Sequence, residues 1–294
     1  MAIAFNAYVV QIVVGLASGS LLFLIASGLT LIFGAMRVVN FAHGSLYMLG
    51  AYLTVWLTPA GGLGNTWFWL VFLAAATLVA GIGLILEVTV FRAIYGRSLL
   101  VQFLVTFSLI FVIAGLLREL FGAGTRTTRS PPALSGSVEF LGASVPTFNF
   151  VFIAAAVLVA LALWALLYGT NLGQMIRAAV SDPALLGLAG VNVNWVFTRV
   201  LVISAFFAGL AGAIVTLSGS VSPSMALNTI IRAFVVVIIG GLGSLRGAFL
   251  GAMLVGVAEA VGILWVPQAS LAIVFAVLVG VLALRPHGLM GGAT

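Results

Sequence analysis

The sequence contains neither cysteine nor lysine. Without cysteine the chain can form no disulfide, no thiolate metal site and no cysteine nucleophile. Without lysine it lacks the Gly-x-x-x-x-Gly-Lys loop that cradles nucleotide phosphates, and it cannot hold a cofactor as a Schiff base. The two histidines, His43 and His287, stand outside any His-Glu-x-x-His pattern. We therefore expect no metal, no cofactor and no enzymatic activity in this chain itself.

Charge is also scarce. Only 5% of the 294 residues are charged and 64% are hydrophobic, whereas a soluble domain carries about 25% charged residues. The apolar runs are continuous rather than alternating, which favours membrane helices over a barrel. The basic residues are all arginine and stand singly at the ends of apolar runs. This placement is typical of topology signals and argues against a nucleic-acid surface. The sequence predicts an all-α integral membrane protein embedded in a lipid bilayer.

Apolar segments long enough for membrane helices follow one another along the chain. A span needs about 20 apolar residues. We expect eight or nine spans in one transmembrane domain covering residues 1–294, because the seventh candidate is short and ends in the glycine-rich stretch Gly240–Ser244. The candidates are Val9–Phe33, Phe41–Leu57, Trp67–Phe91, Leu99–Phe121, Phe148–Leu167, Val200–Ser220, Ile230–Gly243, Ala248–Val266 and Ser270–Leu284.

Arginine placement predicts the orientation of these spans. If the turn at Arg92 and Arg97 is cytoplasmic, nine spans place the N-terminus and the loop Gly122–Thr147 outside. Arg126 and Arg129 in that loop weaken the bias. The loop is the largest extracytoplasmic surface that the sequence offers, or a plain connector. The other ends predicted to be cytoplasmic are those marked by Arg37, Arg177, Arg199, Arg246 and Arg285.

The most polar connected stretch is Asn171–Arg199. Helix-forming residues are interrupted at Pro183, which clashes inside a helix but suits a first helical turn. Asp182 or Ser181 can cap the second helix, which ends by Gly190. The stretch predicts a helix–break–helix segment that docks a cytoplasmic partner, with capping and solvation of a loop as the alternative. The residues expected to form it are Gly173, Gln174, Arg177, Asp182, Pro183 and Gly190.

Charged groups inside the predicted spans are few. Glu87 and Arg92 stand at one end of the third span and can either snorkel to the interface or pair there. Glu259 alone lies well inside a span. An intramembrane acid either serves a transport relay or bonds a neighbouring helix, and a single acid favours the second interpretation. An ion-coupled carrier or channel is therefore the second hypothesis for function.

Two further motifs are candidates for a pathway or gate. Asn40 and His43 open the second span, where Asn40 can cap the helix; the alternatives are gate lining or simple capping and packing. The glycine-rich stretch contributes Gly240, Gly241, Gly243 and Ser244, which fit either a broken transporter helix or a tight turn.

Small-residue spacings occur at Gly15-x-x-x-Gly19 and Gly247-x-x-x-Gly251. Such spacings permit close helix contact, and we expect them to pack within the bundle rather than to form a self-dimer.

Three motifs occur in a distinctive order: Asn40-Phe-Ala-His43-Gly, Gly173-x-x-x-Arg177-Ala-x-x-x-Asp182, and Arg232-Ala-Phe followed by Gly-Gly-Leu-Gly-Ser and Glu259. In this combination the chain resembles permease subunits of branched-chain amino acid ABC importers of the LivH type. The resemblance implies inward transport across the bacterial cytoplasmic membrane. It also implies a second permease (a heterodimer), two cytoplasmic ATP-binding subunits and an extracytoplasmic substrate-binding protein. Asn171–Arg199 then corresponds to the coupling helix. Urea, short amides and aromatic acids stay open as alternative solutes.

Overall fold

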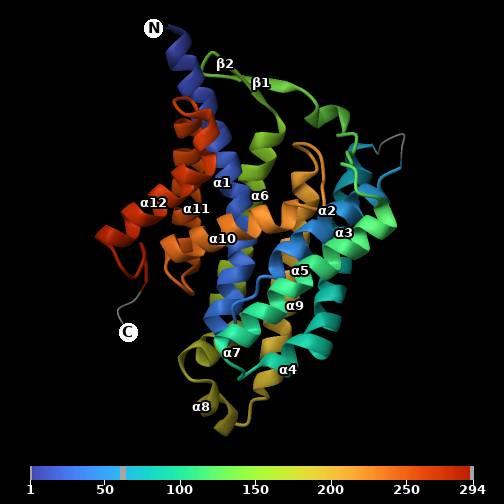
Figure 1. Cartoon of the computed structure of the whole chain (residues 1–294), viewed down its shortest axis with the longest axis vertical. Coiled ribbons are helices and arrows are strands. Elements are labelled where there is room, and N and C mark those ends of the chain that lie inside the picture. The colour runs from blue at the N-terminus through green and yellow to red at the C-terminus, as the bar shows by residue number, and fades with distance from the viewer. Residues whose placement is uncertain (1, 60–63, 292–294) are drawn as a thin grey trace.

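The computed structural model describes residues 2–59 and 64–291 (Figure 1). Residues 1 and 292–294, the ends of the predicted 1–294 domain, lie outside the described residues. The described chain is predominantly helical. Its helices are α1 (Ala2–Met36), α2 (His43–Leu57), α3 (Asn65–Leu86), α4 (Arg92–Ile94), α5 (Leu99–Phe121), α6 (Phe148–Gly169), α7 (Asn171–Ser181), α8 (Pro183–Leu188), α9 (Val193–Val215), α10 (Met225–Gly240), α11 (Leu245–Ile263) and α12 (Ser270–Leu284).

Seven helices in the described residues are long and apolar enough to cross a membrane. They comprise α1, α5, α6, α9 and α11, together with α3 continued through α4, and α12 with the turn before it. The predicted polytopic helical membrane fold is confirmed. Two of the nine predicted passes are shorter, because α2 has 15 residues and α10 has 16. At about 1.5 Å per residue, these two helices fall short of a hydrocarbon core of about 30 Å.

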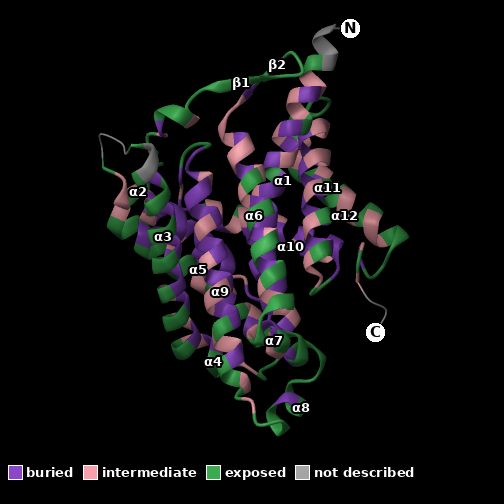
Figure 2. Cartoon of the chain, turned by 180° about the vertical axis from the view of Figure 1, so that it is seen from behind, coloured by how far each residue is buried: buried purple, intermediate pink, exposed green. Residues whose placement is uncertain are grey.

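The core of the bundle is built around α1 and α9. Helix α1 packs against α11, α9, α6 and α10, while α9 also packs against α2 and α3. Figure 2 shows buried residues concentrated along both helices. Helices α1 and α11 approach so closely that a Cβ atom on Gly19 would lie 2.6 Å from the Ala252 carbonyl oxygen. The expectation that Gly15 and Gly19 pack within the bundle is confirmed.

Short elements gather at the two ends of the bundle (Figure 1). Helices α4, α7 and α8 lie at one end, which we call the α8 end. The start of α1 and the hairpin of β1 (Ser137–Phe140) and β2 (Ala143–Pro146) lie at the other, the hairpin end. The arginine ends at α4 and α7 thus share a side opposite the loop Gly122–Thr147, as the predicted orientation requires.

The β1–β2 hairpin was not predicted. Its two-residue loop consists of Leu141 and Gly142, with φ of 51° and 76°. Positive φ at both loop positions is the pattern of a type I′ turn, whose twist matches that of paired strands. An apolar leucine at the first of these positions gives a weak sequence signal, because Asn and Asp are the usual residues there.

A π-helix at Glu87–Phe91 (η1) continues α3 into α4. The predicted third span therefore extends three residues beyond its expected end. The π-turn places Glu87 and Phe91 inside the protein, where both are buried, and single-turn π-bulges of this kind often accompany specialised side-chain placement.

Candidate functional site

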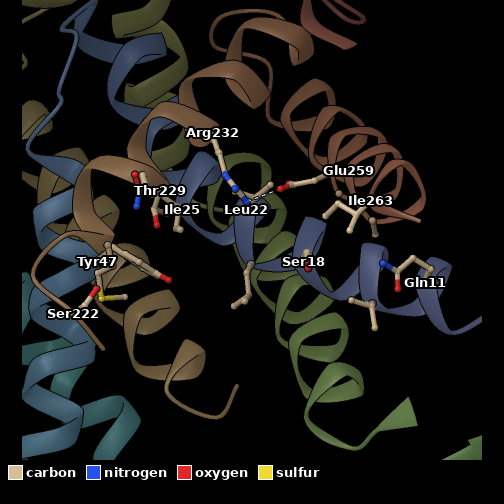
Figure 3. A pocket seen from close by; sticks show the side chains of 16 residues that line it. Gln11, Ser18, Leu22, Ile25, Tyr47, Ser222, Thr229, Arg232, Glu259 and Ile263 are labelled. Carbon is tan, nitrogen blue, oxygen red and sulfur yellow. Dashed lines mark ion pairs between the residues drawn. The ribbon is translucent and has the colours of Figure 1, made fainter. Parts of the chain in front are cut away.

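A cavity of about 450 Å³ lies on the hairpin side of the bundle, between α1, α2, α10 and α11 (Figure 3). We call it the hairpin-side cavity. Its wall combines apolar side chains with several uncharged polar groups and one pair of opposite charges. Its lining residues include Gln11, Ser18, Leu22 and Ile25 of α1, Tyr47 of α2, Asn228, Thr229 and Arg232 of α10, and Glu259 and Ile263 of α11.

Arg232 and Glu259 form an ion pair in this wall, with Nη1 2.8 Å from Oε1. Ser270 of α12 donates a hydrogen bond to the same carboxylate oxygen and accepts one from Arg232 Nη2 at 3.2 Å. Glu259 is only 7% exposed. The prediction that Glu259 bonds a neighbouring helix is confirmed, and the pairing with Arg232 offsets the charge that burial makes costly.

A second cavity of about 570 Å³ lies toward the α8 end. We call it the α8-side cavity. One wall is α7, which contributes Arg177 and Ser181. The facing wall is the turn between α10 and α11, with Gly243 and Ser244, and the start of α11, with Arg246. Helices α1 and α6 complete the enclosure. The structure thus brings a predicted coupling residue, Arg177, and two predicted gate residues, Gly243 and Ser244, to one cavity.

The predicted break after α10 is present. Helix α10 ends at Gly240, Gly241 and Gly243 have φ of 97° and 83°, and Ser244 accepts a hydrogen bond from Gly247 N at 3.1 Å. Gly240 and Gly241 are buried and do not line either cavity. The C-terminal segment covers them, because Leu289 N and Met290 N donate to Ile239 O and Gly240 O at 2.7 and 3.1 Å. These bonds satisfy carbonyls that the end of a helix leaves free.

Asn40 and His43 are buried between helices and line neither cavity. The prediction that Asn40 caps the second span is wrong, because α2 begins after Ala42 and receives no side-chain cap. The Asn40 amide has no partner among the described residues, and His43 bonds Ile25 O through Nε2 at 3.1 Å. The His43 ring is held by its bond to α1, and Asn40 precedes the start of α2, so neither side chain caps that helix.

The predicted helix–break–helix segment is formed by α7 and α8 at the α8 end. Thr170 caps α7 by accepting from Gly173 N at 3.0 Å. A Cβ atom on Gly173 would lie 2.2 Å from the Leu166 carbonyl oxygen, so only glycine fits the junction with α6. Asp182 Oδ1 caps α8 by accepting from Ala184 N and Leu185 N, as predicted.

The remaining predicted residues of this segment have distinct surroundings. Pro183 occupies the first turn of α8, and Gly190 ends the segment with φ of 83°. Gln174 is exposed. The Arg177 guanidinium lies 5.0 Å from the centre of the Tyr168 ring, a cation–π distance. Asp182 is therefore a bracing residue of the segment, while Gln174 and Arg177 keep groups free for other contacts.

Helix α8 also exposes two leucines that sequence reasoning missed. Leu186 is buried, but Leu185 is 64% and Leu188 86% exposed. Large apolar side chains at a polar end of the molecule are a common mark of an interaction site. The sequence already contained a signal for them, because both leucines lie within the short helix that Asp182 and Pro183 start.

A family model described as "Branched-chain amino acid transport system / permease component" matches residues 11–282. The chain belongs to this family.

Several curated members of the family are similar over nearly their full length. The chain is 28% identical to the high-affinity branched-chain amino acid transport system permease protein BraD of Pseudomonas aeruginosa, over 97% of this chain and 96% of BraD. It is 28% identical to the LivH permease of Salmonella typhimurium, over 94% and 93% of the two chains. It is 25% identical to the probable LivH permease of Methanocaldococcus jannaschii, over 92% and 89%. No solved structure matches the chain.

Family membership and the seven membrane-length helices identify a multi-pass protein of the bacterial inner membrane. The relatives are transport permeases rather than enzymes.

A buried carboxylate joins α3 to α9 near the α8 end. Glu87 has no exposed side-chain surface and lies 3.1 Å from Arg92 Nε. Thr198 of α9 donates to Glu87 Oε1 at 3.0 Å and accepts from Arg92 Nη2 at 3.0 Å, and Tyr95 donates at 3.3 Å. The predicted pairing of Glu87 with Arg92 is confirmed. The contribution of Thr198 was missed, because 111 residues separate it from Glu87.

Proposed function

We propose that this chain is the permease subunit of an ATP-binding cassette importer that moves branched-chain or related small amino acids into the cell. The family match across residues 11–282 carries the proposal. ATP is hydrolysed by two separate cytoplasmic subunits, and an extracytoplasmic binding protein delivers the solute. A second permease completes the pathway as a heterodimer.

The α7–α8 segment is the coupling element in this proposal. Closure of an ATPase pair is a rigid-body movement, and a short capped helix can transmit it to the attached spans. The exposed Leu185 and Leu188 fit an apolar groove, while the buried Leu186 ties α8 to the bundle. Because α7 forms a wall of the α8-side cavity, its displacement changes the width of that cavity directly.

The solute pathway runs through the two cavities in this proposal. The hairpin-side cavity receives the solute, and the α8-side cavity releases it past Gly243 and Ser244. The loop Gly122–Thr147, at the hairpin end with β1 and β2, is the surface closest to the binding protein.

The test uses the complete transporter in proteoliposomes. The double variant Leu185→Ser/Leu188→Ser removes both exposed apolar contacts without touching the buried Leu186. We expect ATP-driven leucine uptake to fall about tenfold or more. Two leucine side chains that become buried against the ATPase subunit contribute well over 1.4 kcal/mol to that interface. Melting of the isolated permease stays unchanged.

Leu284→Ser is the matched control, because Leu284 is an 86% exposed leucine at the end of α12, outside the α7–α8 segment, the hairpin loop and both cavities. Its uptake should equal that of the parent chain. Undiminished uptake in the Leu185/Leu188 variant would remove the coupling role of α8.

An ion-coupled carrier is the competing function, and the buried charge of Glu259 is the observation in its favour. It predicts gradient-driven flux in vesicles that contain this chain alone, with loss of that flux in Glu259→Gln. Such a result would replace the importer.

A further inference from the structure

We propose that Arg232 and Glu259 form a binding site for a zwitterionic solute. Arg232 takes the carboxylate and Glu259 the ammonium group, in exchange for their mutual ion pair (Figure 3). The inference rests on the proposed function and narrows its solute class.

Both charged groups have unused bonding capacity. Nε of Arg232 is buried and has no hydrogen-bond partner. Within the described residues, the ion pair and the Ser270 hydroxyl both engage Oε1 of Glu259, and Oε2 accepts no hydrogen bond. Nε and a terminal nitrogen of an arginine can hold a carboxylate bidentately, and a free carboxylate oxygen can accept from an ammonium group.

Charge balance selects the solute. The pair sums to zero, and so does a zwitterion, so partner exchange leaves the cavity neutral. An aromatic acid would bring one uncompensated negative charge into a site between membrane helices, where net charge is unfavourable. Urea and short amides carry no formal charge with which to separate the pair. A zwitterion is the one of these solutes that supplies a partner for each member.

Ser270 allows the exchange to proceed stepwise. Its hydroxyl contacts both members of the pair, donating to Glu259 and accepting from Arg232. After the direct ion pair separates, this hydroxyl still holds each charged group near its original place. The site can therefore open without leaving either charge unsolvated.

The rest of the wall fits an amino acid with an apolar side chain. Leu22, Ile25 and Ile263 supply apolar surface, and Gln11, Ser18 and Asn228 supply polar groups. No side-chain hydrogen bond within the described residues engages these three polar side chains. The cavity of about 450 Å³ falls in the usual range of small-molecule sites, about 300–1,000 Å³.

The decisive experiment measures leucine uptake per ATP hydrolysed by the complete transporter in proteoliposomes. The variant Arg232→Met/Glu259→Gln removes both charges and keeps the net charge unchanged. We expect binding-protein-stimulated ATPase activity to stay within about twofold, as for substitutions that leave the coupling surface intact. Uptake per ATP should fall about tenfold or more, because hydrogen bonds to charged groups contribute roughly 1.5–3 kcal/mol.

Glu87→Gln/Arg92→Met is the matched control, because it removes a second ion pair outside both cavities. Its uptake per ATP should equal that of the parent chain. Equal uptake per ATP in the Arg232/Glu259 variant would overturn the proposal and leave the pair as a tie between helices.

A second variant covers the case in which the double variant does not assemble. Asn228→Ala alters the same wall at an exposed position without breaking a side-chain bond. Uptake of leucine per ATP should fall severalfold, and an unchanged value would count against the site.

Uptake measurements with leucine, urea, a short amide and an aromatic acid separate the zwitterion site from the importer function. ATP-driven uptake of urea, an amide or an aromatic acid, with none of leucine, would overturn the zwitterion site and keep the importer. Absence of any ATPase stimulation and of any uptake in the parent complex would overturn the importer itself.

Discussion

The two arginine–glutamate pairs in the described residues have different surroundings. The pair of Arg92 and Glu87 lies at a joint between α3 and α9, where Thr198 and Tyr95 add three hydrogen bonds around it. The pair of Arg232 and Glu259 lies in a cavity wall, with one added hydroxyl and one orphan nitrogen. The Glu87 side chain is fully buried, whereas the Glu259 side chain is 9% exposed and lines a cavity; their arginine partners are 43% and 31% exposed.

This difference separates a structural role from a binding role. A buried charge is stable only when its bonding capacity is used. Glu87 Oε1 accepts hydrogen bonds from Arg92, Tyr95 and Thr198, so movement there would break all three contacts. Glu259 and Arg232 leave part of their capacity unused, so they can accept new partners. In both pairs the glutamate is the more buried member. Substitution of the arginine therefore costs more unfolding free energy, because it leaves the more buried charge unpaired.

The largest effect is expected from Arg92→Met. It leaves the fully buried Glu87 carboxylate without its counter-charge, and breaking a buried pair costs about 3 kcal/mol even at the lower end of measured values. Denaturant titration of the permease in micelles should show this loss of unfolding free energy. The neighbouring Arg97→Met should leave it unchanged, because no described ion pair or side-chain hydrogen bond involves the Arg97 side chain. An equal loss of unfolding free energy in both variants would show that the ion pair of Arg92 and Glu87 does not stabilise the protein.

Glu259→Gln should lower the unfolding free energy less than Arg92→Met does. The amide keeps the hydrogen bond with Ser270, and the stranded Arg232 side chain is 31% exposed toward the cavity. We expect a loss of about 1.5 kcal/mol in unfolding free energy, near the low end for an unpaired group. The same titration measures it, and a loss as large as that of Arg92→Met would mean that the two sites are equally enclosed.

The smallest effects are expected from the two hydroxyl groups. Thr198→Val removes a donor and an acceptor contact at the enclosed pair and should cost about 1 kcal/mol. Ser270→Ala exposes its partners to cavity water and should cost about 0.5 kcal/mol. Parallel titrations compare the two variants, and the reverse order would contradict the proposed difference in enclosure.

The sequence predicts those parts of the fold that local physics decides. Apolar runs of membrane length specify the spans, and the Asp182-Pro183 step specifies the start of α8 because cap and proline act within three residues. The glycine-rich stretch likewise marks the end of α10. These signals need no information about distant neighbours.

Long-range contacts are what the sequence does not disclose. Asn40 was expected at a helix cap, but α2 begins at His43 without a side-chain cap and Asn40 is buried instead. Thr198 reaches Glu87 and the C-terminal segment reaches α10 only in three dimensions. The cavities have the same origin, since each is walled by segments that are far apart in the chain. Arg232 and Glu259 were noticed in one motif, yet only the fold shows that they pair.

Helix α1 borders both cavities, but with different faces. Leu22 and Ile25 face the hairpin-side cavity, and Thr30 and Gly34 face the other. At 3.6 residues per turn these two sets lie about 130° apart around the helix axis. A tilt of α1 about its midpoint would therefore enlarge or constrict both chambers together. A lateral displacement would shrink one chamber while enlarging the other, so alternating access to the two sides would require sliding of this helix rather than rocking.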